Sequence, residues 1–270
     1  MKHWHRHSIA ALGALAAASS VEAQTRPGFQ VAVEAFDYRY RERVDGATVV
    51  RDDGVFAGLA FSYVETLRDG WFIRVAGQGA AAEVDYRDDE GARIDDVDQG
   101  VSRFELGIGR DFPVGAVTLT PSVAVGARVL RDESGGRLAS DGARGYDREV
   151  GYVYVPLGLA AGVSAGGRAR LTVSGRYGWI VGGDVRSGLS EADATLPDLR
   201  LDIDGGHMWE LDAALTMPLG RRALSIGPFV RRWSADRSES RVVTAPAFAV
   251  EFFEPPARTA EAGLRIGFAF

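Results

Sequence analysis

The sequence predicts an all-β fold, a closed antiparallel up-and-down β-barrel of ten strands. Three observations predict it. Apolar and polar residues alternate with a period of two in segments spread over the whole 270-residue chain, as they do along a half-buried strand. These segments run to about 12 residues or more, whereas strands of globular proteins average about 5–6. The connections between them are alternately short and long from one end of the chain to the other.

Each strand segment is long enough to cross a bilayer. A tilted strand crosses with about 9–11 residues. The clearest alternation places Trp209, Leu211 and Leu215 on one face and Glu210 and Asp212 on the other. The fold class is therefore a transmembrane β-barrel. The expected strands are 29–40, 54–67, 71–86, 100–112, 116–131, 147–163, 168–184, 206–218, 222–235 and 258–270.

The connections have the asymmetry of a bacterial barrel, in which tight periplasmic turns alternate with longer extracellular loops. The short ones carry turn residues. They are Arg68-Asp69-Gly70, Pro113-Val114-Gly115, Ala165-Gly166-Gly167 and Gly220-Arg221. The long ones are expected as loops over 41–53, 87–99, 132–146, 185–205 and 236–257.

The polar faces of the strands predict a charged interior. A charged side chain that faces lipid at mid-membrane costs about 2–4 kcal/mol for Arg or Lys, so these residues are expected to line the lumen. Arginine and carboxylate can pair there with bidentate geometry. The expected lumen-lining residues are Glu34, Arg74, Arg103, Glu105, Arg128, Arg176, Glu210, Asp212, Arg231, Glu261 and Arg265.

Two further expectations concern aromatic residues. Aromatic side chains near strand ends are expected to form interfacial girdles. In the first strand the apolar face switches after Ala35, because Phe36, Tyr38 and Tyr40 alternate the other way. Either a β-bulge near Ala35–Phe36 or an upper part of the strand that projects beyond the membrane explains the switch. The expected girdle residues are Tyr38, Tyr40, Tyr63, Trp71, Phe72, Tyr86, Phe112, Tyr152, Tyr154, Trp179 and Trp233.

The N-terminus predicts export. Residues 1–23 read as a secretory signal peptide, with Lys2 and Arg6 before a short apolar run and Val21-Glu22-Ala23 as the cleavage site. Residues 24–270 are then the barrel domain. The chain has no cysteine, so it has no disulfide framework. Its net charge of −6 argues against a nucleic-acid-binding surface.

No catalytic, metal or cofactor site is expected. His207 is the one histidine after the signal peptide, and Asp184, Asp193, Asp202 and Asp204 lie near it in the sequence. In strand count and residue types alone this is similar to the omptin outer-membrane proteases, without any local omptin motif. The acidic loop 87–99 lacks the ligand spacing of a calcium site, and no metal is assigned to it. The apolar last loop, 245–256, is expected to pack against other loops or to contact a partner.

Taken whole, the chain resembles the outer-membrane β-barrel proteins of Gram-negative bacteria, grouped loosely as porin-like. The signal peptide, the short–long rhythm and the final run Arg265-Ile266-Gly267-Phe268-Ala269-Phe270 carry this resemblance. It implies location in the outer membrane and partners in its lipid and lipopolysaccharide. Leu264, Ile266, Phe268 and Phe270 would form the signal for the barrel-assembly machinery.

Three functions stay open on the sequence. The first is a barrel with a plugged lumen that acts through its extracellular loops, because interiors of about eight strands are filled by side chains. The second is a narrow channel for small solutes or ions. The third is an outer-membrane hydrolase that depends on His207. The extracellular ligand is unknown.

Overall fold

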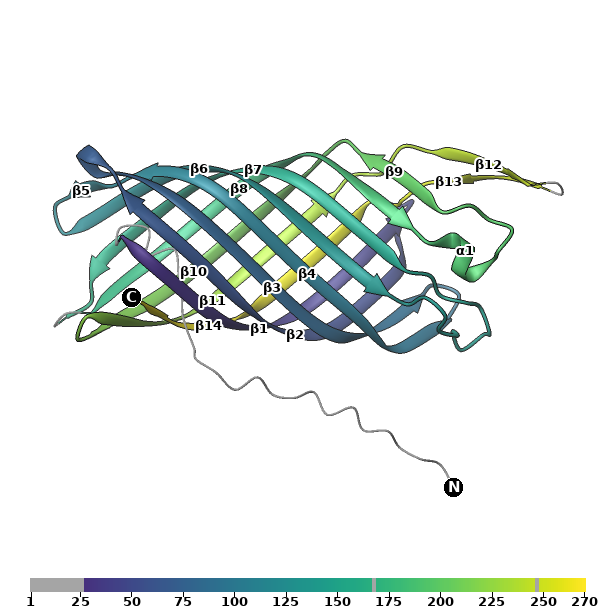
Figure 1. The fold of residues 1–270 in the computed structure, drawn as a ribbon, viewed down its shortest axis with the longest axis horizontal. Helices are drawn as coiled ribbons and strands as arrows, with labels where there is room; N and C mark the ends of the chain where they lie inside the picture. The colour runs from purple at the N-terminus through teal and green to yellow at the C-terminus, as the bar shows by residue number, and fades with distance from the viewer. Residues whose placement is uncertain (1–26, 167–168, 246–247) are drawn as a thin grey trace, which may run out of the picture.

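A computed structural model describes residues 27–166, 169–245 and 248–270, and these residues form a closed antiparallel barrel (Figure 1). The expected signal peptide, residues 1–23, lies outside the described residues. The limits of the barrel domain, 24–270, stay a prediction.

The ten expected strands are confirmed, and they form the barrel wall. They range from 13 to 20 residues in length. Their bounds are β1 (Gly28–Val44), β2 (Ala47–Thr66), β3 (Trp71–Asp88), β4 (Arg93–Arg110), β6 (Val117–Glu133), β7 (Arg148–Ser164), β8 (Arg170–Ser187), β10 (Gly206–Leu219), β11 (Arg222–Ala235) and β14 (Ala257–Ala269).

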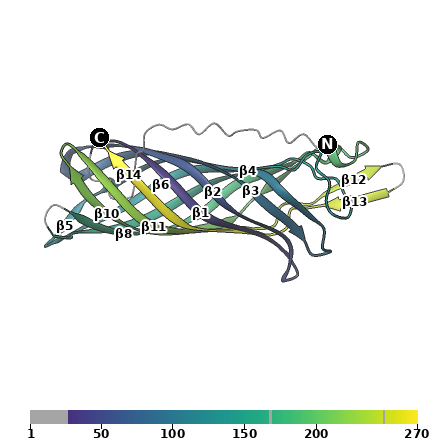
Figure 2. The same ribbon diagram turned by 90° about the horizontal axis from the view of Figure 1, so that it is seen from below.

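Each strand pairs with its neighbour in the sequence, and β14 pairs with β1 to close the ring. The pairing of β8 with β10 completes the circuit past the short β9. The remaining described elements are small and lie at the two ends of the barrel (Figures 1 and 2). They are η2 (Arg68–Gly70), β5 (Phe112–Val114), α1 (Leu189–Ala192), β9 (Leu199–Ile203), β12 (Arg241–Ala245) and β13 (Phe248–Phe252).

The two ends differ as expected, but two of the expected long loops are strands. One end, the turn end, carries the short connections; the other, the loop end, carries the long ones. Residues 41–53 and 87–99 mostly extend the β1–β2 and β3–β4 hairpins. Asp45 and Gly46 both have positive φ (49° and 85°), which allows the tight two-residue turn that continuous hairpins favour. Because these segments are polar, the sequence pattern did not indicate that they pair as strands.

An apolar belt faces outward from the barrel wall. Leu59, Ile73, Leu106, Leu157 and Leu264 are examples, with exposed fractions of 41–60%. A soluble protein rarely exposes apolar side chains so continuously, whereas a transmembrane barrel must present them to lipid. Among the described residues, no helix is long and apolar enough to cross a membrane.

The switch of face in β1 is explained by projection beyond the apolar belt. The register of β1 with β2 and β14 runs without a bulge through Ala35 and Phe36, and shifts only between Glu42 and Arg43. Phe36, Tyr38 and Tyr40 are therefore buried inside the barrel, on the same face as Glu34. The outward positions beyond Ala35 become charged because they lie above the belt.

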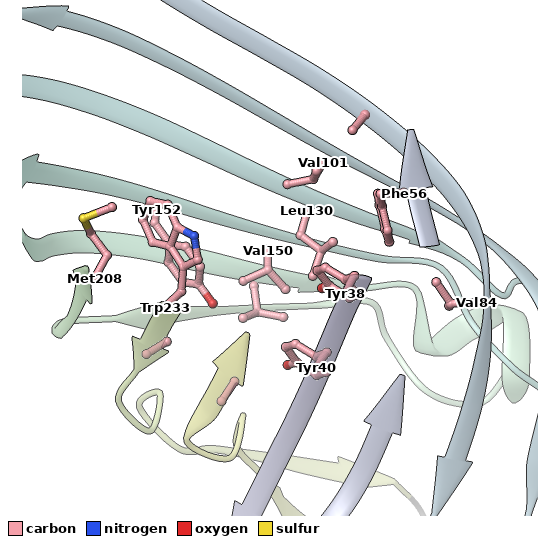
Figure 3. Packing of buried hydrophobic residues seen from close by; sticks show 14 of the residues in the cluster. Tyr38, Tyr40, Phe56, Val84, Val101, Leu130, Val150, Tyr152, Met208 and Trp233 are labelled. Carbon is pink, nitrogen blue, oxygen red and sulfur yellow. The ribbon is translucent and has the colours of Figure 1, made fainter. Parts of the chain in front are cut away.

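The interior towards the loop end is an apolar and aromatic core, shown in Figure 3. Tyr38, Tyr40, Phe56, Tyr152 and Trp233 pack there with aliphatic side chains such as Val101 and Leu130. The expected girdle is wrong for Tyr38, Tyr40, Phe72, Tyr152, Tyr154 and Trp233, which are buried. These side chains lie on the inward faces of their strands, so the rings fill the barrel instead of facing the membrane interface. Tyr63, Trp71, Phe112 and Trp179 do lie on the exposed outer face.

Candidate functional site

Arg231 lies at the centre of a buried network of ion pairs. It projects from β11 and is 1% exposed. Its guanidinium contacts the carboxylates of Glu34 (2.9 Å), Glu210 (3.1 Å) and Glu261 (2.8 Å). It also donates to the side-chain oxygen of Gln78 at 3.0 Å. Because these partners come from β1, β10, β14 and β3, one arginine ties together strands around much of the barrel.

Further ion pairs cross the interior from wall to wall. Arg128 on β6 pairs with Glu261 on β14 at 3.3 Å, and these strands are diametrically placed in the ring. Arg103 on β4 pairs with Glu210 on β10 at 3.0 Å. Pairs of this kind cannot form unless the opposite walls are within reach of two side chains.

Arg176 pairs with Glu105 in bidentate geometry. Its two terminal nitrogens contact Glu105 at 2.7 and 2.9 Å, and one of them also contacts Glu210 at 2.7 Å. The Tyr154 hydroxyl donates to Glu105 at 2.7 Å. Charge-assisted hydrogen bonds of this kind are among the strongest in proteins.

The remaining expected lumen residues lie in the same layer. Arg265 contacts Glu34 at 2.7 Å, and Asp212 accepts a hydrogen bond of 2.5 Å from the Ser174 hydroxyl. Arg74 is half-buried and makes no ion pair with a described residue. Ten of the eleven residues thus have a partner of opposite charge or a hydrogen-bonding hydroxyl. Two small cavities, of about 30 and 20 Å³, adjoin Arg74.

The sequence did not indicate the aromatic part of this network. The Arg231 guanidinium lies 4.1 Å from the ring centroid of Phe229, and that of Arg128 lies 5.0 Å from Trp233. A cation over a desolvated ring gains about 2 kcal/mol. The alternation of residues in β11 could have indicated these aromatic contacts, because Phe229 and Trp233 lie on the same face of the strand as Arg231.

At the loop end the connections pack on one another. Val243 of β12 is buried with Leu189 of α1 and Leu199 of β9, and Phe252 of β13 packs against them. Part of the expected apolar last loop is thus covered by other loops. In the same region, hydrogen bonds from the hydroxyl and backbone N–H of Ser190 lower the pKa of Asp198.

His207 does not form a catalytic couple with the aspartates near it in the sequence. It lies exposed on the outer wall, with its ring centroid 6.0 Å from that of Tyr177. Asp184 instead pairs with Arg186 and Arg200, and Asp193 bonds Thr195. Within the described part of the chain, no His and acidic residues converge as three or more possible metal ligands.

A row of arginines crosses the outer wall near the loop end. The row consists of five arginines, one from each of five neighbouring strands. Each is the direct cross-strand partner of the next. All stand on the outward face, where like charges placed opposite one another destabilise a sheet. Arg41 and Arg87 have aspartate partners, and the other three make no ion pair with a described residue. The row is Arg258, Arg41, Arg51, Arg87 and Arg93.

Comparison with known proteins gives a likeness of fold. No protein-family model matches the chain, and no curated protein matches it. The outer membrane protease OmpT from Escherichia coli is similar in structure, with a TM-score of 0.54 at 11% identity over 90% of this chain and 97% of that one. The translocator domain of the autotransporter NalP from Neisseria meningitidis gives a TM-score of 0.34 at 12% identity, over 88% of each chain. The closed ten-stranded barrel, its outward apolar belt and its charged interior make this chain an outer-membrane β-barrel, located in the outer membrane.

Proposed function

We propose that this protein is a barrel closed to solutes that acts as a binding protein through its loop end. The observation that carries the proposal is the ion pair between Arg128 and Glu261, which joins opposite walls. The cavities beside this layer, about 30 and 20 Å³, have room for one or two waters each.

The apolar core towards the loop end supports the same conclusion. A permeating ion would have to pass both the ion-paired layer and the packed rings of Tyr38, Tyr154 and Trp233. Open aqueous channels are typical of barrels with 16–18 strands, whereas narrow barrels are filled by side chains.

The test is conductance of the folded protein. The chain without residues 1–23 is refolded in detergent, its folding is checked by a heat-shifted gel band, and currents are recorded in a planar bilayer beside a general porin. We expect a silent bilayer. Discrete, reproducible current steps would contradict the proposal.

A narrow channel is the second candidate, and Arg74 favours it. This arginine adjoins both interior cavities, which Glu105 also lines, and makes no ion pair with a described residue, so its guanidinium could contact a passing anion. If current steps are seen, Arg74→Gln changes their anion selectivity under this alternative. A hydrolase gains no support from His207, whose imidazole faces outward.

The outer arginine row suggests a lipid partner. Its side chains face sideways from the wall beyond the apolar belt, where headgroups of the outer leaflet lie. Arginine matches phosphate with paired N–H donors. We therefore place lipopolysaccharide, through its phosphate groups, among the partners of this barrel; assembly by the barrel-assembly machinery is proposed on the residue pattern of β14.

A further inference from the structure

A chamber of about 130 Å³ lies at the loop end, among the outer parts of β2, β3, β4 and β6 and the connection from β6 to β7. It is separate from the ion-paired layer, with which it shares no lining residue. Its walls include the carboxylates of Asp52 and Asp132, the rings of Tyr86 and Tyr146, and the side chains of Arg144 and Arg148.

Two carboxylates in this wall share one neutral donor. The side-chain nitrogen of Gln99 donates to Asp52 Oδ2 at 3.0 Å and to Asp132 Oδ2 at 2.6 Å. Asp52 and Gln99 are 3% and 2% exposed. The second oxygens, Asp52 Oδ1 and Asp132 Oδ1, are buried and find no hydrogen-bond partner among the described residues, nor does Gln99 Oε1.

The neighbouring arginines do not hydrogen-bond to this pair of carboxylates. Arg148 is held by Glu42 at 2.7 Å, by the Tyr40 hydroxyl at 2.7 Å and by Glu254. Arg144 is exposed at the rim and makes no ion pair with a described residue. Both arginines line the chamber, but neither donates a hydrogen bond to the carboxylate of Asp52 or Asp132. Burying a carboxylate oxygen without a partner is costly, so a ligand that donates hydrogen bonds to these oxygens would be stabilised.

The rest of the wall suits an organic cation better than a metal ion. The rings of Tyr86 and Tyr146 and the small apolar side chains of Ala92 and Ala139 line the space. Aromatic faces attract cations, and the alkyl part of an amine fits against short apolar groups. Calcium takes six to eight oxygens, and no convergence of three or more acidic or histidine groups that would hold a metal is found in the described residues.

We propose that this chamber binds a small organic cation that carries a primary ammonium or guanidinium group. The N–H groups of the ligand donate to Asp52 Oδ1 and Asp132 Oδ1, and its alkyl portion lies between the two tyrosine rings. This inference rests on the proposed binding role of the loop end and names the chemical class of one ligand.

Calorimetric titration of the refolded full barrel tests it, with n-butylammonium and agmatine as probes. The neutral 1-butanol is the matched control for the charge, and calcium chloride is the probe for a metal. We expect saturable binding of both amines, and none of 1-butanol or calcium. Equal binding of 1-butanol, or binding of calcium without the amines, overturns the proposal.

Three variants locate the site. Asp52→Asn is expected to weaken amine binding at least tenfold, whereas Asp53→Asn, the next residue on the outward face, leaves it unchanged. Ala139→Phe fills the chamber and keeps both carboxylates, so it gives the same loss if Asp52→Asn does not fold. An Asp53→Asn barrel that loses binding as strongly as Asp52→Asn contradicts the assignment. If the barrel conducts ions but still binds amines, the proposal of a closed lumen is wrong and the amine site stands. If the barrel is silent and binds no amine, the amine site is wrong and the closed lumen stands.

Discussion

Arg128 and Glu261 form an ion pair across the full width of the barrel. Their atoms Nη2 and Oε1 are 3.3 Å apart, and both side chains are 2% exposed. Glu261 also contacts Arg231 at 2.8 Å, so the wall-to-wall pair is part of a network that includes the neighbouring strand β11. The interior is thus cross-linked by charge rather than merely lined by it.

Arg231→Met is expected to destabilise the barrel by about 3–5 kcal/mol, because removing one partner leaves buried charges uncompensated. Three carboxylates lose a contact at once. Urea unfolding in lipid vesicles measures the change. Arg39→Met is the control, since its ion pair with Asp37 is exposed and such pairs contribute about 0–1 kcal/mol. Equal effects of the two variants would show that the network adds no stability.

Gly126→Val is expected to cost about 1–3 kcal/mol through overpacking. A Cβ atom at Gly126 would lie 2.5 Å from the Tyr154 ring, whose hydroxyl donates to Glu105. Gly79→Val is the matched control, because a Cβ there meets nothing within 4 Å. The measurement is the unfolding midpoint of each variant. A Gly126→Val barrel as stable as the Gly79→Val barrel would mean that the Tyr154 ring moves aside freely.

Replacing Arg51, Arg93 and Arg258, the three row arginines without an ion pair to a described residue, together by alanine is expected to lower lipopolysaccharide binding at least tenfold. The control replaces Arg131, Arg186 and Arg200, which also face outward but have carboxylate partners. Binding of the refolded barrels to vesicles with intact or dephosphorylated lipopolysaccharide gives the comparison. If dephosphorylation leaves wild-type binding unchanged, the arginine row does not recognise phosphate.

Phe270→Ala is expected to reduce assembled barrel in cells several-fold and to leave refolding in detergent nearly unchanged. Its ring is exposed, with the Arg222 guanidinium 5.2 Å from the centroid, so burial does not explain a large effect on stability. Heat-shifted bands from outer membranes and from refolded protein give the two values. A parallel loss in both would assign Phe270 to stability instead of recognition.

The period-two pattern, the length of the strands and the alternation of short and long connections together predicted the barrel. Alternation in 206–218 sends Glu210 and Leu211 to opposite faces, and lipid on one side leaves a single orientation for the charged face. All ten strands follow from that constraint, and so does the interior position expected for Arg103, Arg231 and Glu261. Strand ends were underestimated, because outside the bilayer both faces can be polar and the pattern fades at Arg41 and Arg93.

The tertiary structure decided which interior groups meet. Arg128 and Glu261 are 133 residues apart, and their pairing depends on closure of the ring and on the relative stagger of distant strands, which no local pattern records. The same closure brings Asp52 beside Asp132 under Gln99, although both lie in segments expected as loops. The sequence thus determined on which side of the wall each residue of a spanning strand lies, because the face of a residue depends only on its own strand. The partner of that residue across the barrel depends on the positions of all ten strands.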